Sequence, residues 1–429
     1  MNAFKVIMDV MERWKPYMIK VIPIAVLRKL KRRYMKWNTD RLKKEKIMPF
    51  DPQHYEDGMN LIGNSKGDFG LGQSCRLIAW ELKYSKIPFG IYEYVLSDDS
   101  HSNDSSCEGM LISEPKYNIN LFHINANEFT AAYYRLGKKT WDYRYNIAFW
   151  LWELEEFPKD WMGCIDILDE IWTPSEFVSR AIRKRTNKPV ITIPYHVEAS
   201  ADPKYDRKYF GLPEDQFLFL VMYDSNSMIE RKNPMSALLA FKEAFSKENQ
   251  KVGLIVKMNG KNQADMSGLR KYLDGYKNIY FIMDVLSKIE VNSLIAAANV
   301  CVSMHRAEGF GLVLAEAMLN HVPCIATNWS ANTEFMNSDV ACMLDYKLIP
   351  IEEDIGPFQK GNYWADADIH QAAGYMQKLY QDKEFYLQMA ERAKQYVDEA
   401  LGMKRITAQI KSRLKKIYEQ GSNRRIREG

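Results

Sequence analysis

A glycine-containing turn between an apolar strand and a helix constrains the fold of this chain more than any other stretch. Residues 300–302 are apolar and predict a buried strand, and apolar residues return at helical spacing further on. Gly309 and Gly311 therefore lie in a strand-to-helix turn. Such a turn favours an anion, because the first N–H groups of a helix lack internal partners and glycines let a ligand approach the backbone. Two carboxylates, Glu308 and Glu316, flank this predicted anion site.

The spacing of these carboxylates resembles a known signature. Two glutamates separated by seven residues around a glycine turn are similar to the motif of retaining, nucleotide-sugar-dependent glycosyltransferases of the GT-B fold, family GT4. One departure is that His321 stands where that family usually has a glycine. The resemblance implies that Glu308 acts on the transferred sugar as a catalytic residue, and that Glu316 accepts hydrogen bonds from the ribose of the donor. It also implies that the donor is bound along the turn by Gly309, Phe310, Gly311 and Leu312.

The length of the chain and the order of its predicted elements set the fold class. At 429 residues the chain is too long for one ordinary core, and predicted strands alternate with helices through both halves. We therefore expect an α/β protein of the GT-B type, with two Rossmann-like doubly wound domains facing a cleft and a basic helical N-terminal extension. The expected segments are 1–50 (extension), 51–198 (acceptor-side domain), 199–208 (linker), 209–400 (nucleotide-sugar domain) and 401–429 (crossover helix and basic tail).

The N-terminal extension is strongly basic. Residues 1–48 hold fourteen Lys or Arg and four Asp or Glu, a balance of +10 in a chain whose net charge is +4. Leu27, Leu30, Tyr34 and Trp37 recur among these charges at helical spacing. The segment fits an amphipathic helix on an anionic membrane surface, or equally a solvated basic helix docked on the body of the protein. Nucleic acid is not expected as a partner, because no nucleic-acid-binding motif accompanies the charge.

Three features bear on the location of the protein. The longest apolar run of the extension, Val21 to Leu27, is too short to cross a bilayer. The N-terminus lacks the uninterrupted hydrophobic core of a signal peptide. The six cysteines show no CxxC spacing, which favours a reducing compartment and argues against a zinc site. We therefore expect a cytoplasmic protein, peripheral on the inner face of the membrane if the extension binds lipid.

The first domain opens with a strand over 59–63, followed by Gly67, Gly70 and Gly72 and then by a helical pattern. This strand, glycine loop and helix form a Rossmann-like opening. The order is G-x-x-G-x-G rather than G-x-G-x-x-G, so it does not by itself predict a dinucleotide site. The GT4 resemblance implies that Gly70 and Gly72 lie near the donor phosphate and the acceptor. A tight turn required only by the path of the chain is the alternative.

His123 stands near the end of an apolar strand that runs into a polar turn. Its position resembles that of a histidine found near the sugar in many GT4 enzymes, which makes it a catalytic candidate. A histidine at the end of a strand can also be purely structural. Asn125, in the same turn, is a candidate for binding the acceptor.

An aromatic segment, Trp150-Leu151-Trp152-Glu153, resembles the W-x-W-E segment of a subset of these transferases. Indole faces suit the apolar faces of sugar rings, so Trp152 is an acceptor candidate. Glu153 is a second acceptor candidate, because its carboxylate can orient an acceptor hydroxyl. Core packing is the expected role of Trp150 and an open alternative for Glu153.

The second domain opens with a continuous apolar strand over 217–223, typical of a strand buried on both faces. Arg231 and Lys232 follow it, directly before a helix whose start is set by Pro234. Ligands of open α/β sheets bind at this carboxyl end of the strands. The resemblance implies that the two cations act in catalysis by neutralising the donor diphosphate. Further donor-binding candidates are Asp224, Ser227 and Lys257.

No metal and no cofactor are expected, and a nucleotide sugar such as a UDP- or GDP-sugar is the co-substrate. The only D-x-D, Asp366 to Asp368, directly precedes a predicted helix, where an N-cap explains it better than a metal site. The expected function is retaining transfer of a sugar to a glycan or lipid-linked acceptor, in bacterial surface polysaccharide synthesis. Two alternatives are a GT-B sugar-nucleotide epimerase and a non-catalytic scaffold that binds a nucleotide sugar or a glycan.

Overall fold

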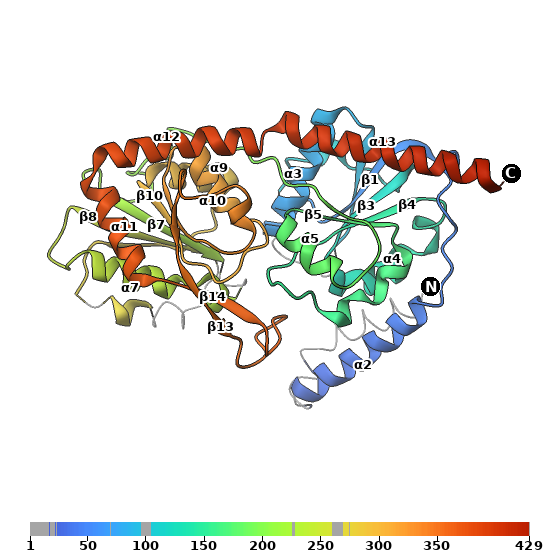
Figure 1. Ribbon diagram of the computed structural model, residues 1–429, viewed down its shortest axis with the longest axis horizontal. Coiled ribbons are helices and arrows are strands. Elements are labelled where there is room, and N and C mark those ends of the chain that lie inside the picture. Colours follow the sequence, from blue (N-terminus) through green and yellow to red (C-terminus); the bar gives the residue numbers. More distant parts are fainter. Residues whose placement is uncertain are drawn as a thin grey trace.

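The computed structural model describes residues 17, 22, 24–68, 70–95, 104–224, 228–259, 269–273 and 275–428, with no description of the side chains at 24, 25, 28, 29, 31, 32, 35 and 422–428. The chain forms two domains side by side, each with a parallel sheet between helices (Figure 1). This confirms the predicted α/β architecture of two doubly wound domains. Within the described residues, no helix combines the length and hydropathy that a membrane span requires.

The first domain is built on a six-stranded sheet in the order β2-β1-β3-β4-β5-β6. All its pairings are parallel, and β1 and β3 are almost wholly buried, as expected for strands covered on both faces. The strands are β1 (Glu56–Gly63), β2 (Phe89–Glu93), β3 (Tyr117–His123), β4 (Tyr145–Phe149), β5 (Glu170–Thr173) and β6 (Val190–Thr192). The helices are α3 (Gly70–Ser85), α4 (Phe129–Leu136), α5 (Glu176–Arg183) and the 3-10 turns η1 (Glu108–Met110), η2 (Ala126–Glu128), η3 (Lys138–Thr140) and η4 (Lys159–Ile167).

The second domain has a six-stranded sheet in the order β12-β11-β10-β7-β8-β9. Its strands are β7 (Phe217–Asp224), β8 (Val252–Asn259), β9 (Ile279–Ile282), β10 (Val300–Ser303), β11 (Cys324–Thr327) and β12 (Cys342–Leu344). The helices are α6 (Ile229–Lys232), α7 (Pro234–Ala244), α9 (Lys288–Ala297), α10 (Leu312–Leu319), α11 (Ile369–Gln381) and α12 (Lys383–Ala400), with the 3-10 turn η6 (Ala331–Glu334). Local signals start these helices: Pro234 is at the first position of α7, and Ser287 with Glu290 forms a capping box for α9.

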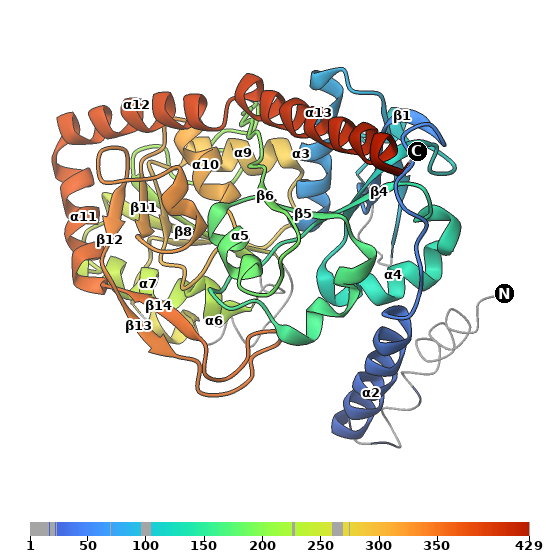
Figure 2. The ribbon, with the colours of Figure 1, turned by 45° about the vertical axis from the view of Figure 1, so that its right-hand side comes forward.

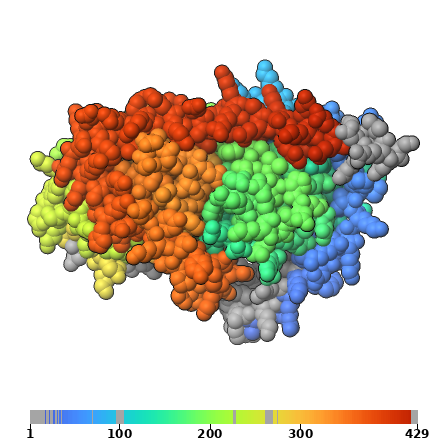
Figure 3. Space-filling model, in the orientation of Figure 1, coloured from blue at the N-terminus to red at the C-terminus, as the bar shows by residue number. Residues whose placement is uncertain are grey.

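Two helices connect the domains or extend from them. Helix α13 (Met403–Glu428) continues from α12 and crosses the first domain, so that both helices line one edge of the molecule (Figures 1 and 3). Arg413 of α13 forms an ion pair with the buried carboxylate of Glu170 in β5, which attaches the helix to that domain. Helix α2 (Ile24–Leu42) lies against the first domain, where Leu42 is buried and the hydroxyls of Thr39 and Thr130 are 3.0 Å apart.

An antiparallel hairpin projects from the second domain. Its strands are β13 (Tyr346–Pro350) and β14 (Tyr363–Ala367), with five residue pairs in register. The loop between the strands extends toward the first domain, as the views in Figures 1 and 2 show. We refer to residues 346–367, the two strands with their loop, as the hairpin strap.

Candidate functional site

Glu308 lies between two cations at the centre of the predicted anion turn. The Nζ atom of Lys232 forms an ion pair with Oε1 of Glu308, and an Nη of Arg231 lies 3.3 Å from the same oxygen. Arg231 is buried and also donates a hydrogen bond of 2.9 Å to the carbonyl oxygen of Ala307. Both cations belong to α6, the short helix that follows β7, so they stand at the carboxyl end of the second sheet. The structure thus brings together three residues that the sequence had singled out separately.

The ionisation of this cluster follows from its burial and its charges. Burial alone raises the pKa of the Glu308 carboxyl, but attraction to Lys232 and Arg231 outweighs it and lowers that pKa to about 2. Burial lowers the pKa of the Lys232 ammonium, and the attraction of Glu308 opposes that shift. Glu308 is therefore a carboxylate at neutral pH, and it holds both cations in place with little water around them.

The turn that follows Glu308 needs both of its glycines. A Cβ on Gly309 would lie 2.6 Å from the carbonyl oxygen of Trp152 in the first domain, so only glycine permits this approach. Gly311, the N-cap of α10, has a φ of 102°, a left-handed conformation that L side chains rarely adopt. The Glu308 N–H donates to the hydroxyl of Ser330 over 2.9 Å. The turn is therefore shaped by both domains and by the loop after β11.

Contacts between the domains continue beside the turn, through residues that were not predicted to join the two domains. The Ser175 hydroxyl, which also caps α5, donates to the carbonyl oxygen of Gly309 over 2.9 Å. The carboxylate of Glu334 accepts hydrogen bonds from the N–H groups of Glu176 and Phe177, at 2.9 and 2.8 Å. A carboxylate at the start of a helix is a favourable partner for its unpaired N–H groups. Such pairings depend on how the domains meet, and no local pattern indicates them.

Glu316, the candidate for the donor ribose, is buried on α10 and forms an ion pair with Lys288. Lys288 is the first residue of α9, and about a third of its side chain is exposed. Lys288 was not among the residues predicted for the site. The capping box at Ser287 could have placed it at the first turn of a helix, but its partner is visible only in the structure.

His305 lies beneath the loop that carries Glu308 and is bonded to its neighbours there. It is fully buried, with Nδ1 2.9 Å from the Ser303 hydroxyl and Nε2 3.0 Å from Oδ1 of Asn332. Burial lowers its pKa, so the ring is neutral at pH 7. A neutral imidazole that is hydrogen-bonded at both ring nitrogens fixes the backbone of the loop that leads to Glu308.

His123, expected near the sugar, is buried at the carboxyl end of β3 with 1% of its surface exposed. Its Nε2 lies 2.6 Å from the hydroxyl of Ser74, which is hydrogen-bonded in turn to the Tyr195 hydroxyl. The Tyr195 ring meets the ring of Phe310 edge-on, with centroids 5.0 Å apart. Burial lowers the pKa of His123 to about 4. The structure therefore connects His123 to Phe310 of the predicted anion turn through two intervening side chains, Ser74 and Tyr195, rather than placing it at an exposed surface.

The two glycines of the first loop differ in their surroundings. A Cβ on Gly72 would lie 2.1 Å from the carbonyl oxygen of Gly67, so the tight turn itself requires glycine there. Gly70 begins α3 and has open space around it, which leaves its backbone accessible. Arg76, which the sequence analysis overlooked, holds the loop by donating to the carbonyl oxygens of Ser65 and Gly67, each over 2.8 Å.

The two acceptor candidates of the W-x-W-E segment, Trp152 and Glu153, differ in their exposure. Trp150 is fully buried, as expected, but Trp152 is also 98% buried, with its ring 5.6 Å from that of Phe358 and its Nε1 bonded to the carbonyl oxygen of Glu156. An indole enclosed in this way offers no free face to a sugar, which argues against the role expected for Trp152. Glu153 remains partly exposed, and its Oε1 lies 3.9 Å from an Nη of Arg231.

The remaining candidates in the described residues lie toward the carboxyl ends of internal strands of the two sheets. Asn125 follows β3 and is partly buried. Asp224 ends β7 beside β8, which carries Lys257. Lys257 is buried and donates to Asn259 over 2.5 Å, and burial lowers its pKa to about 8. Ser227 lies outside the described residues.

Metal-ligating residues do not gather in the part of the chain that the structure describes. No group of three or more His, Cys, Asp or Glu side chains there could hold an ion. Asp368 caps α11 by accepting the N–H of Gln371 over 3.0 Å, which confirms the N-cap interpretation of the D-x-D. Asp366 bonds to Arg306.

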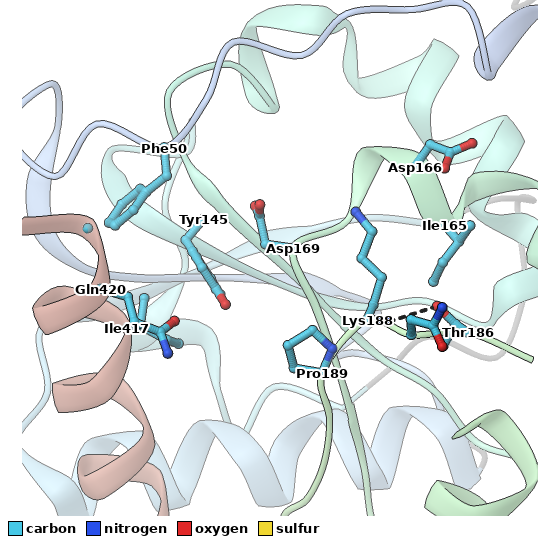
Figure 4. Close-up of a pocket in the computed structure, with 12 residues that line it drawn as sticks. Phe50, Tyr145, Ile165, Asp166, Asp169, Thr186, Lys188, Pro189, Ile417 and Gln420 are labelled. Carbon is cyan, nitrogen blue, oxygen red and sulfur yellow. Dashed lines mark hydrogen bonds between the residues drawn. The ribbon is translucent and has the colours of Figure 1, made fainter. Parts of the chain in front are cut away.

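A cavity of about 500 Å³ lies elsewhere, between the amino ends of β4 to β6 and the end of α13. Figure 4 shows Phe50, Tyr145, Asp169 and Lys188 around it. It shares no residue with the Glu308 cluster, which stands at the carboxyl end of the other sheet. Ligands of doubly wound sheets bind at carboxyl ends, so we do not assign this cavity to the candidate site.

Comparison with known proteins bears on the fold and on the family of the second domain. Residues 204–396 match the family model of glycosyl transferases group 1. The whole fold is similar to the crystal structure of Anabaena Alr3699/HepE in complex with UDP and glucose, with 13% identity, a TM-score of 0.63 and coverage of 84% of this chain and 100% of that one. The glycosyltransferase from Rickettsia africae ESF-5 has 14% identity, a TM-score of 0.62 and coverage of 85% and 99%.

A third similar structure is the sucrose-phosphate synthase (tll1590) from Thermosynechococcus elongatus, with 13% identity, a TM-score of 0.60 and coverage of 87% of this chain and 100% of that one. Among curated proteins, no relative matches the chain. The fold is thus GT-B, two Rossmann-like domains, as the sequence predicted. The family match to the second domain, together with this fold, supports a GT-B glycosyltransferase.

Proposed function

We propose that this chain is a retaining glycosyltransferase of the GT4 type, which transfers a sugar from a UDP- or GDP-sugar without a metal ion. The acceptor is a glycan or a lipid-linked glycan, and the process is the synthesis of a bacterial surface polysaccharide. The observation that carries this proposal is the buried cluster in which Glu308 is held between Arg231 and Lys232, at the carboxyl end of the second sheet and beside Glu153 of the first domain.

The cluster suits a reaction with an anionic leaving group. Breaking the bond between a sugar and a diphosphate builds negative charge on the phosphate nearest the sugar. Fixed cations stabilise that charge more in the transition state than in the ground state, so Arg231 and Lys232 replace a metal ion in this role. Their position after β7, before α7, is where an open α/β sheet receives a phosphate ligand.

The carboxylates take different roles in the proposal. Glu308 is ionised and paired with both cations, so it accepts hydrogen bonds from sugar hydroxyls and is not free to attack the sugar as a nucleophile. Glu153, partly exposed on the other domain, orients the attacking hydroxyl of the acceptor. Retention is supported by the resemblance of the segment 308–316 to the GT4 signature. A structure of similar fold contains UDP and glucose, which makes UDP-glucose a suitable first donor to test.

The proposal is tested by incubating the purified chain with a panel of UDP- and GDP-sugars in the absence of acceptor. We expect one donor to be hydrolysed slowly to the free sugar and the nucleoside diphosphate, and the anomer that forms first, seen by NMR, to match the donor. Chelation of divalent ions should not change the rate. Appearance of an epimer would instead identify an epimerase, and tight binding without turnover would identify a scaffold.

A matched variant for this assay is Glu316→Gln, which tests the ribose assignment. A carboxylate that accepts from a hydroxyl contributes about 1.5 to 3 kcal/mol, so donor affinity should fall roughly 10- to 150-fold. Its partner Lys288 is partly exposed and can be solvated when the charge is removed, so the fold should persist. Unchanged nucleotide affinity in Glu316→Gln would remove Glu316 from the donor site.

The membrane part of the proposal rests on α2. Val26, Leu30 and Trp37 lie on one face of this helix and are 46%, 51% and 58% exposed. Leu27 and Tyr34, which the sequence analysis placed on the same apolar face, are only partly exposed. The helix is thus docked on the body and still presents an apolar face, so the two alternatives from the sequence are compatible. An exposed apolar face within a basic segment is typical of helices that bind anionic lipid.

Removal of residues 1–48 should abolish sedimentation of the protein with anionic vesicles and leave donor hydrolysis unchanged. The truncation also removes α2 from the domain surface, so Trp37→Glu is the sharper variant. It places a negative charge on the exposed face of α2 and leaves in place the side chains that dock this helix on the domain. Salt should release the wild-type protein, since the attraction is screened over about 8 Å at physiological ionic strength. Vesicle binding that survives both variants would move the membrane contact to another surface.

A further inference from the structure

The hairpin strap makes an unusual connection, because it begins and ends in the second domain and is buried against the first. Three of its side chains, Ile351, Phe358 and Trp364, are 2%, 2% and 4% exposed. They share an apolar cluster with the first-domain residues around Trp150 and Trp152. The ring centroids of Phe358 and Trp152 are 5.6 Å apart. The loop of the strap therefore touches the W-x-W-E segment directly.

The base of the strap is bonded to the loop that carries Glu308. Arg306, two residues before Glu308, donates from Nε and an Nη to Oδ1 of Asp366, over 3.0 and 2.8 Å. The N–H of Ala365 donates to the carbonyl oxygen of Arg306 over 3.1 Å. These hydrogen bonds join β14 of the strap to the loop that carries Glu308.

A third contact joins the strap to the helix of the two cations. Gly356 has a φ of 57°, and a Cβ there would lie 2.5 Å from Cε of Met228. Met228 is the N-cap of α6, which carries Arg231 and Lys232. The strap thus contacts all three segments that supply charged groups to the site: α6, the Glu308 loop and the segment that contains Glu153.

The loop of the strap is ordered by its own bonds. Ile355 and Phe358 exchange two backbone hydrogen bonds of 2.9 Å each, and Ile351 donates to the carbonyl oxygen of Asn362 over 2.8 Å. Lys360 donates its N–H to the carboxylate of Asp354 over 2.8 Å. This bonding presents Phe358 to the first domain as part of a defined turn.

We propose that the hairpin strap positions the acceptor-side carboxylate against the donor side, with Phe358 as the positioning residue. Phe358 does not touch the reacting atoms; it acts through Trp152, which precedes Glu153 in the chain. The inference rests on the proposed function, because it assigns the strap a role in transfer. Domains joined by linkers move relative to one another unless an interface restrains them. The strap restrains the side of the interface that holds Glu153, whereas Ser175 and Glu334 restrain the side at α5.

The test is Phe358→Ala, measured with donor and acceptor together. Displacement of a reacting group by about 1 Å costs on the order of 100-fold in rate, so we expect kcat for transfer to fall about 30- to 100-fold. Donor affinity should change less than about 2-fold, because the residues proposed to bind the donor, Gly309 to Leu312 and Glu316, belong to the second domain. Phe358→Leu should restore most of the rate, since it refills much of the apolar space. Equal losses in donor affinity and kcat would overturn the positioning role.

Leu348→Ala is the matched control, because Leu348 lies on β13 of the same strap and is 45% exposed. It should leave both kcat and donor affinity unchanged. A rate loss equal to that of Phe358→Ala would mean that any damage to the hairpin suffices, and would overturn the assignment to Phe358.

Amide hydrogen exchange tests the coupling without any enzymatic activity. In Phe358→Ala, amides of residues 150–156 should exchange at least about 10-fold faster than in the wild type, while those of β7 and β8 keep their protection. Unchanged exchange over 150–156 would overturn the inference even if transfer were slowed. Should the wild type transfer no sugar at all, the proposed function fails, and the exchange result still decides whether the strap orders the Glu153 segment.

Discussion

Replacement of Lys232 by alanine is expected to lower kcat about 100- to 1,000-fold, the range seen when one preorganised donor to a developing anion is removed. Lys232 and Arg231 converge on Glu308 in a buried cluster, where a fixed charge acts with little screening by water. The loss should appear mainly in kcat, since the negative charge on the leaving phosphate grows in the transition state. Single-turnover measurement of donor cleavage is the appropriate assay.

The control for this prediction is Lys404→Ala, which removes an exposed lysine of α13 far along the chain and should leave turnover unchanged. The Lys232→Ala protein should keep its fold, because Arg231 still neutralises Glu308. Near-normal turnover by a folded Lys232→Ala variant would show that Lys232 does not stabilise the leaving group.

Glu308→Gln is expected to reduce both activity and stability. Removing one partner of a buried ion pair costs about 3 to 5 kcal/mol, and the low end applies here because the Lys232 side chain is 23% exposed. Activity should fall at least about 100-fold, because the amide no longer holds the two cations or accepts from the sugar as a carboxylate does. Urea unfolding at pH 7 measures the first effect and donor cleavage measures the second.

The stability difference between the wild type and Glu308→Gln should depend on pH in a defined direction. The pKa of Glu308 is lowered from 4.5 to about 2 in the folded protein, so its carboxylate contributes stability above pH 4.5. That contribution is lost as the pH falls from 4.5 through 2, and the two proteins should converge in that window. A difference that stays constant between pH 7 and pH 3 would mean that the cations do not hold Glu308 ionised.

The elements of the fold could be predicted closely because their signals are local. The apolar run of β7 and the aspartate that caps α11 act within a few residues of themselves, and the structure contains both of them. The turn at Gly309 and Gly311 is also local, since it depends on backbone conformation and close approach. The alternation of these elements then restricts the topology to parallel sheets.

The burial of individual aromatic residues could not be predicted in the same way. Trp150 and Trp152 stand in one short apolar segment, and the sequence suggested an exposed role for the second. In the structure Phe358, more than two hundred residues later in the chain, lies against Trp152 and helps to enclose it. His123 is likewise buried, with the hydroxyl of Ser74 from α3 bonded to its ring and the ring of Phe149 stacked on it. Periodicity identifies apolar residues, but it does not identify which distant surfaces will cover them.

The sequence by itself determined that this chain has two doubly wound domains and a glycine turn flanked by two carboxylates, because strand periodicity, helix capping and glycine geometry are properties of short segments. Only the tertiary structure decided which charges meet. Lys232 and Glu308 are 76 residues apart in the chain, and Lys288 and Glu316 are 28 apart. These pairs form because parallel strands bring their carboxyl ends to the same side of the sheet. The pKa of Glu308 is lowered because its charge partners are held close in a buried place, where little water separates the charges.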